Sequence, residues 1–157
     1  MVRIRDLLQD NLVIEEIEAT DKNGVVREFA VMLKSAGKLQ DEDAAARILL
    51  ERESLGSTGI GDGVAIPHGK IRGLKEMVVS FGRSKKGVDF QALDGKPVYL
   101  FFLLLTPDDN PGEHLRTLAR ISRILKNPVL RGDLRNAEGG ADLQRIILEE
   151  DGKYPQK

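Results

Sequence analysis

An uninterrupted apolar run of eight residues, Val98 to Leu105, limits the fold of this chain more than any other sequence feature. A strand whose side chains are apolar on both faces belongs in the centre of a sheet, with further layers packed above and below it. The run is far shorter than the ~20 residues that a membrane-spanning helix needs. The sequence therefore predicts a buried central strand of a soluble protein.

Periodic patterns on either side of this strand predict helices and further strands. Apolar residues recur at helical spacing from Asp21 to Ala36, from Asp41 to about Glu53, and most strongly from Gly112 to Leu125. We expect Leu12–Ile17 to be a strand near a sheet edge and Lys85–Gly87 to be a turn between two strands. The remaining predicted elements are strands at Val64–Ile66, Met77–Arg83 and Gly87–Phe90, and helices at Asp133–Ala137 and Ala141–Glu149. Together they predict an α/β fold, a three-layer α/β/α sandwich with a central mixed β-sheet flanked by helices.

The length and composition of the chain favour one domain and exclude several kinds of chemistry. We expect residues 1–157 to form a single domain with its core at about 4–148, and Glu149–Asp151 to be a frayed acidic end. The absence of cysteine excludes thiol catalysis, cysteine-ligated zinc, iron–sulfur clusters and disulfides. Basic and acidic residues number 24 and 25 and aromatics are 4%, so no nucleic-acid partner is expected. Charges stand where a signal peptide would be apolar, which predicts a cytoplasmic protein without membrane insertion.

His68 is the first candidate for chemistry, because it follows a glycine-rich stretch and a short strand. We expect Gly56 to Gly63 to be irregular and to let backbone amides approach a ligand closely. Pro67 fixes its own backbone angle, and we expect Gly69 to leave room for the imidazole. No Gly-Lys-Ser/Thr follows the glycines, which disfavours nucleotide hydrolysis. These features predict a rigidly held histidine at a strand end, facing solvent or a cleft.

His114, the second of the two histidines, lies in the first turn of the helix predicted from Gly112 to Leu125. It shares the inward stripe with Leu118 and Ile121. Unpaired amides and partial positive charge at a helix N-terminus attract an anion such as phosphate. The same field is expected to depress the pKa of His114 and to keep it a neutral hydrogen-bond donor.

Imidazole is a competent phosphoryl acceptor near neutral pH, because an unperturbed pKa of ~6.5 leaves a nitrogen lone pair available. Donors for the phosphoryl oxygens are available from Arg52, from the Ser57 and Thr58 hydroxyls, and from amides of the glycine-rich loop. Each of these residues also has an ordinary structural interpretation: His68 as a turn residue, His114 as a packing residue, and Arg52 as a solvated helix end. The residues alone leave both interpretations open.

The segment from Arg52 to Lys70, RESLGSTGIGDGVAIPHGK, resembles the enzyme IIA domain of the fructose/mannitol class of the bacterial phosphoenolpyruvate-dependent phosphotransferase system. Within that class it looks most like the nitrogen-regulatory branch. Gly87-Val88-Asp89-Phe90, the apolar run and Glu113-His114-Leu115 follow in the family's order, so the resemblance covers about residues 4–148. The family's fold is a mixed sheet flanked by helices in three layers, as the periodicity also predicts.

The resemblance implies a role for each candidate residue. His68 matches the histidine that receives the phosphoryl group on Nε2 from the phosphocarrier protein HPr or its nitrogen-branch counterpart. His114 matches the histidine that hydrogen-bonds the active imidazole or its phosphoryl group, and Arg52 matches an arginine that helps to hold phosphate. Ser57 and Thr58, with Gly59 beside them, match the phosphate-binding active-site loop. No metal and no organic cofactor is expected.

Four functions remain in competition at this stage. The first is a phosphocarrier whose phosphorylation state regulates an unknown target protein, consistent with a chain that ends soon after the domain. The second is a sugar-specific enzyme IIA that passes phosphate to a separate IIB protein, and gene neighbourhood would separate these two. The third is a binding module that has lost transfer, which the intact set of Arg52, His68 and His114 opposes. The fourth is a two-histidine metal site, which lacks a third ligand.

Overall fold

Strand β6 (Val98–Pro107) contains the apolar run and lies inside a mixed sheet in the computed structural model, which describes residues 3–154. All of its residues except Tyr99 and Pro107 are buried. The sheet has six strands in the order β1-β5-β6-β3-β2, and β4 also pairs with β6. Strand β6 runs antiparallel to β5 and parallel to β3 and β4. The predicted central strand is thus confirmed. The other strands are β1 (Val13–Ile14), β2 (Gly59–Gly61), β3 (Val64–Ala65), β4 (His68–Ile71) and β5 (Val78–Val88).

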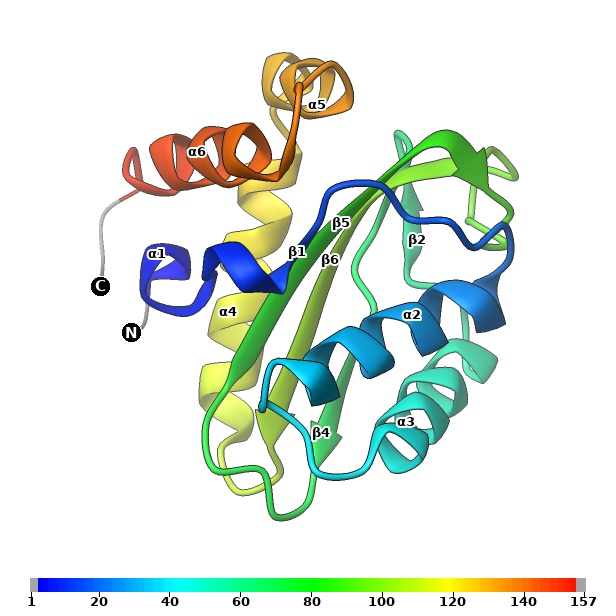
Figure 1. The fold of residues 1–157 in the computed structure, drawn as a ribbon, viewed down its shortest axis with the longest axis vertical. Helices are drawn as coiled ribbons and strands as arrows, with labels where there is room; N and C mark the ends of the chain where they lie inside the picture. The colour runs from blue at the N-terminus through cyan, green and yellow to red at the C-terminus, as the bar shows by residue number, and fades with distance from the viewer. Residues whose placement is uncertain (1–2, 155–157) are drawn as a thin grey trace.

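Helices cover both faces of this sheet (Figure 1). Helices α2 and α3 pack together on one face, and α4, α5 and α6 lie on the other together with the short α1. The predicted three-layer α/β/α sandwich is therefore confirmed. Within residues 3–154, none of the helices combines the length and the apolar character needed to cross a membrane. The helices are α1 (Ile4–Leu7), α2 (Lys22–Ser35), α3 (Glu42–Ser54), α4 (Pro111–Leu125), α5 (Pro128–Arg135) and α6 (Gly140–Asp151), with a 3-10 turn η1 at Asp10–Leu12.

Strands β3 and β4 are two parts of one strand in a single register against β6. Ala65 pairs with Phe101 and His68 with Leu104, so the same offset of 36 positions holds on both sides of the break. Pro67 lies in the break because proline has no N–H to give to a sheet ladder. The interruption leaves the backbone of Ile66 free to serve other partners, and it places His68 at the first position of the resumed strand.

Three strand predictions differ from the structure. The two strands and the turn predicted within residues 77–90 are one strand, β5 (Val78–Val88), because the ladder shifts register between Arg83 and Val88 and then continues. Gly87 allows this irregularity: its φ is +88°, and a Cβ there would stand 2.9 Å from the Tyr99 ring. The glycine-rich stretch is not wholly irregular, since β2 pairs antiparallel with β3. The predicted edge strand is confirmed in place but shortens to β1.

The C-terminal helices also correct the prediction. Helix α5 begins five residues earlier than expected, because the Asn127 side chain accepts from the amides of Val129 and Leu130 and a proline occupies the first turn. Helix α6 extends to Asp151, and this acidic end is not frayed. Asp151 is fully buried and its Oδ1 lies 2.6 Å from Nε of Arg120 on α4. The local sequence pattern could not predict this ion pair, because Arg120 lies on a different helix.

Candidate functional site

His68 occupies the end of the break between β3 and β4, with its side chain half-buried. Its Nδ1 lies 2.7 Å from the carbonyl oxygen of Ile66. A carbonyl can only accept a hydrogen bond, so Nδ1 of His68 carries the proton and Nε2 keeps its lone pair. The geometry therefore makes Nε2 the nucleophilic ring atom.

The pKa of His68 lies below its ordinary value of 6.5. Burial is the largest cause, and the positive charge of Arg52 acts in the same direction. The hydrogen bond to Ile66 and the negative charge of Glu53 act in the opposite direction. The net result is a neutral imidazole at neutral pH, as phosphoryl acceptance requires.

Gly69 does not serve the purpose that the sequence suggested. A Cβ at this position would stand 2.8 Å from Cγ2 of Ile48 on α3, and the imidazole is not among its nearest neighbours. Alternation along a strand explains the difference, because residues 68 and 69 point to opposite faces of the sheet. The glycine therefore permits close packing of α3 against β4.

His114 comes to the same place from the other layer of helices. Its ring centroid lies 5.5 Å from that of His68, with the two planes tilted by 52°. The side chain is 5% exposed, in agreement with its predicted inward position. Its Nδ1 lies 2.6 Å from the hydroxyl oxygen of Thr106, the penultimate residue of β6. The structure thus brings together the two histidines that the sequence singled out.

The pKa of His114 is lowered from 6.5 to about 4. The predicted direction is confirmed, but the largest cause is burial of the ring, followed by repulsion from His68 when it is protonated and from the charge of Lys70. The amides that were expected to be unpaired are also occupied. Asn110 accepts from the amide of Glu113 with its side chain and from the amide of His114 with its carbonyl. Helix α4 is therefore capped by its own Asn110, which occupies two of the amides of the first turn.

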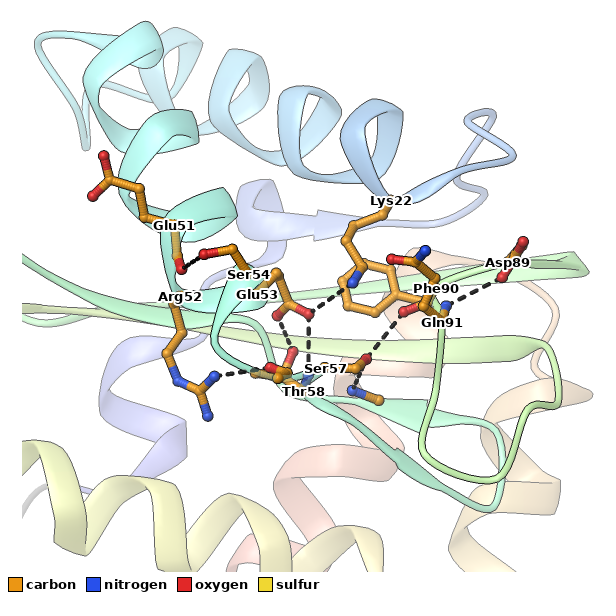
Figure 2. Close-up of polar contacts among 12 residues, drawn as sticks. Lys22, Glu51, Arg52, Glu53, Ser54, Ser57, Thr58, Asp89, Phe90 and Gln91 are labelled. Carbon is orange, nitrogen blue, oxygen red and sulfur yellow. Dashed lines mark hydrogen bonds and ion pairs between the residues drawn. The ribbon is translucent and has the colours of Figure 1, made fainter.

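Arg52 lies in the last turn of α3, and the loop of residues 56–59 follows directly after this helix (Figure 2). Nη1 of Arg52 donates to the carbonyl of Gly56 at 2.9 Å in an exposed hydrogen bond, and the arginine as a whole is half-buried. This bond uses one of the five N–H groups of an arginine. The electrostatic influence of Arg52 on His68 indicates that its charge reaches the imidazole.

The side chains of Ser57 and Thr58 face protein acceptors. The Thr58 hydroxyl donates to Glu53, and the residue is 4% exposed. The Ser57 hydroxyl donates to the carbonyl of Phe90 at 3.0 Å and accepts from the amide of Gly59 at 3.0 Å. Both hydroxyls thus donate their hydrogen to groups of the protein, whereas the sequence predicted that they donate to a phosphoryl group.

Glu53 is the site residue that the sequence analysis missed. Its buried carboxylate accepts the amide of Thr58 at 3.0 Å as well as the Thr58 hydroxyl, and it lies 3.5 Å from Nζ of Lys22 (Figure 2). Helical spacing offered a signal, because Glu53 follows the buried Leu49 by four residues and so shares its inward face. Lys22 on α2 gave no comparable signal, since its meeting with Glu53 depends on how α2 packs against α3.

A chain of hydrogen bonds connects this carboxylate to the active imidazole. Glu53 accepts from the Thr58 amide, the Thr58 carbonyl accepts from the Ile66 amide at 3.0 Å, and the Ile66 carbonyl accepts from His68. The loop and the broken strand therefore form one hydrogen-bonded unit. Among residues 3–154, no cluster of three His, Asp or Glu side chains has the geometry to hold a metal ion.

Comparison with known proteins places this geometry in a family. Residues 6–150 match the family described as "Phosphoenolpyruvate-dependent sugar phosphotransferase system, EIIA 2". A nitrogen regulatory protein of Bradyrhizobium diazoefficiens is 39% identical over 146 residues, which is 92% of this chain and 94% of that protein. A fructose-specific EIIABC component of Bacillus subtilis is 38% identical over 96% of this chain, and the chain spans 24% of that longer protein.

A solved structure agrees with these sequence relatives. The crystal structure of the nitrogen regulatory protein IIA-Ntr from Neisseria meningitidis superimposes with a TM-score of 0.86 at 33% identity, covering 92% of this chain and 98% of that one. Sequence, fold and the paired histidines thus lead to one assignment. The chain belongs to the EIIA-2 family of the phosphoenolpyruvate-dependent sugar phosphotransferase system, whose members are phosphotransferases that act through a phosphohistidine.

Proposed function

We propose that this chain is a phosphohistidine phosphocarrier in which Nε2 of His68 accepts a phosphoryl group from an HPr-type carrier. The observation that carries the proposal is the hydrogen bond from Nδ1 of His68 to the Ile66 carbonyl, which leaves Nε2 unprotonated. In the transfer, a bond forms between phosphorus and Nε2 while the bond between phosphorus and the donor's histidine breaks. The electron pair of the broken bond returns to the donor imidazole. Because one phosphoramidate replaces another, the transfer is nearly reversible.

The neighbouring residues divide the remaining work. We assign to Arg52 the role of offsetting charge on the phosphoryl oxygens, since its charge acts on the His68 imidazole and only one of its N–H groups is used by Gly56. His114, whose pKa is lowered to about 4 and whose ring centroid lies 5.5 Å from that of His68, supplies a neutral hydrogen bond to the phosphoryl group. Such preorganised donors stabilise charge that develops in the transition state. The two donors come from different helix layers, Arg52 from α3 and His114 from α4.

The loop residues Ser57, Thr58 and Gly59 contribute through the shape of the loop. The two hydroxyls are engaged with Phe90 and Glu53, so their side chains hold the loop against the protein. A Cβ at position 59 would stand 2.9 Å from Ala92, which explains why a glycine is needed there. This role replaces direct phosphate binding by the hydroxyls.

The regulatory function follows from similarity to the nitrogen regulatory proteins of Bradyrhizobium and Neisseria. Phosphorylation replaces a neutral ring with a group bearing about two negative charges, which is enough to change the affinity of a partner for this surface. The second candidate is a sugar-specific enzyme IIA that passes phosphate to a separate IIB protein. The similarity to a fructose-specific component favours this alternative.

A reconstitution experiment tests the central proposal. The protein is mixed with phosphoenolpyruvate, enzyme I and an HPr-type carrier, and the acid-labile modification is mapped by mass spectrometry. We expect one phosphoryl group per chain, on His68. A modification on His114, or none at all in wild type, contradicts the proposal.

A second experiment separates regulation from sugar uptake. The phosphorylated protein is isolated and mixed with purified fructose-type IIB, and the phosphoryl group is followed with time. Rapid transfer to IIB supports the sugar-uptake function. A phosphoryl group that stays on His68 in the presence of IIB supports the regulatory function.

A further inference from the structure

Thr106 is a fully buried polar residue that neither the sequence analysis nor the proposed function uses. It lies near the end of β6, where it pairs in register with Lys70 of β4, two residues after His68. Its hydroxyl oxygen stands 2.6 Å from Nδ1 of His114, and the residue is 0% exposed. A buried hydroxyl in a mostly apolar strand needs a specific partner, because an unsatisfied polar group costs free energy.

The direction of this hydrogen bond follows from the available partners. Among residues 3–154, Nδ1 of His114 is the one hydrogen-bond partner that the Thr106 side chain has. If Nδ1 were protonated, it would donate to the hydroxyl, and the hydroxyl hydrogen would have no acceptor in this buried place. If the hydroxyl donates instead, both groups are satisfied. The hydroxyl of Thr106 is therefore the donor and Nδ1 of His114 the acceptor.

This direction determines which nitrogen of His114 carries the proton. Burial lowers the pKa of His114 to about 4, so the ring is neutral near pH 7 and holds one N–H. With Nδ1 as an acceptor, that N–H lies on Nε2. A proton on Nε2 is what His114 needs to donate a hydrogen bond toward the imidazole or phosphoryl group of His68, 5.5 Å away between ring centroids.

We propose that Thr106 is a positioning residue for phosphoryl transfer, whose hydroxyl holds His114 in the tautomer that donates from Nε2. The inference rests on the proposed function for its effect on rate, but the tautomer itself can be measured independently. Without the hydroxyl, Nδ1 of His114 has no fixed partner and the ring is free to change tautomer or orientation. Hydrogen bonds of this second layer orient a functional imidazole in the same way around metal sites.

The test compares two variants of Thr106 by NMR and by kinetics. Thr106→Val removes the hydroxyl but keeps the shape of the side chain, and Thr106→Ser keeps the hydroxyl. The chain has only two histidines, so ¹⁵N spectra of their rings are readily assigned, with His68→Ala identifying the remaining signals. In wild type we expect protonated Nε2 and unprotonated Nδ1 for His114. In Thr106→Val we expect intermediate shifts, and in Thr106→Ser the wild-type pattern.

The kinetic arm measures single-turnover transfer from phosphorylated HPr-type carrier. Thr106→Val is expected to slow transfer about 2- to 10-fold, the range that one neutral hydrogen bond supplies, while His68 still becomes fully phosphorylated. Thr106→Ser restores the rate. In a His114→Ala background, Thr106→Val causes no further loss, because Thr106 acts through His114. A merely structural role would instead give an additional loss in that background.

Three results would overturn the inference: protonated Nδ1 on His114 of wild type, an unchanged rate in Thr106→Val, or additive losses in the double variant. The wild-type spectrum remains decisive even if Thr106→Val does not fold. Wild type that accepts no phosphate contradicts the proposed function instead, while the tautomer of His114 still tests the structural part of this inference.

Discussion

The two histidines lie side by side but are held by different kinds of partner. His68 donates to a backbone carbonyl, which has no donor of its own and therefore permits one tautomer. His114 meets a hydroxyl, which can donate or accept, so its tautomer depends on that hydroxyl having no other acceptor. The tautomer of His68 is thus fixed by a backbone group, which no substitution of a side chain removes. The tautomer of His114 is fixed by the Thr106 side chain, which a single substitution can remove.

The ion pairs that hold the elements around His68 and around His114 also differ. The loop beside His68 is held by the carboxylate of Glu53, which the cation of Lys22 approaches at 3.5 Å. Helix α4, which carries His114, is held by the buried ion pair of Arg120 with Asp151, whose Oδ2 also accepts from the amide of Arg5. The second pair is shorter and more completely buried. Breaking it should therefore cost more stability than neutralising Glu53.

Replacement of each histidine in turn should have the largest effect on phosphoryl transfer, and the two variants should differ from each other. His68→Ala should abolish phosphoryl acceptance, since the attacking nitrogen is gone. His114→Ala should slow transfer about 100-fold, as expected for the loss of one preorganised donor, and should leave the final extent of phosphorylation unchanged. Single-turnover labelling from phosphorylated carrier measures both. Equal losses in the two variants would remove the distinction between acceptor and donor.

Removal of the buried charge on α6 tests the ion pair that holds the elements around His114. Asp151→Asn should lower the free energy of unfolding by about 3–5 kcal/mol, because it removes the negative charge that lies 2.6 Å from the buried guanidinium of Arg120. Asp142→Asn, on the same helix, is the matched control: Asp142 also pairs with an arginine, Arg145, but at the surface. Denaturant unfolding should show little change in this control. Equal destabilisation by both variants would argue against a special role for burial.

Neutralisation of Glu53 tests the ion pair that holds the elements around His68. Glu53→Gln should lower the free energy of unfolding by about 2 kcal/mol, since the amide can still accept from Thr58 but loses the charge that faces Lys22. We also expect slower phosphoryl transfer, because the loop is less firmly held. Glu51→Gln, an exposed neighbour on the same helix, should change neither quantity. Comparable effects at positions 51 and 53 would contradict this assignment.

The lowered pKa of the buried His114 ring should make the free energy of unfolding depend on pH, and this is the smallest effect that we predict. The unfolded state binds a proton near pH 6.5, whereas the folded state does so only near pH 4. Unfolding therefore takes up a proton between these values, and stability falls as the pH falls. From pH 6.5 to 5.5 this group should account for about 1 kcal/mol. The loss should be absent in His114→Gln, so identical pH slopes for the variant and wild type would contradict the lowered pKa.

Local patterns were sufficient for much of the fold. Apolar residues on both faces of β6 predicted its central position, and helical spacing of apolar residues predicted α2, α3 and α4. The same patterns failed where a chain irregularity decides the outcome. The strand β5 continues through a register shift that Gly87 permits, and a local pattern of turn residues cannot distinguish such a bulge from a hairpin.

The sequence by itself determined the candidates for chemistry: a histidine between proline and glycine, a second histidine in the first turn of an amphipathic helix, and an arginine at a helix end. Tertiary structure alone decided how these groups are paired and protonated. The meeting of Thr106 with His114, of Lys22 with Glu53 and of Arg120 with Asp151 depends on how helices and strands pack, and no local period encodes that packing. Burial then determines which of these contacts matter, because a polar group removed from water must find its partner within the protein.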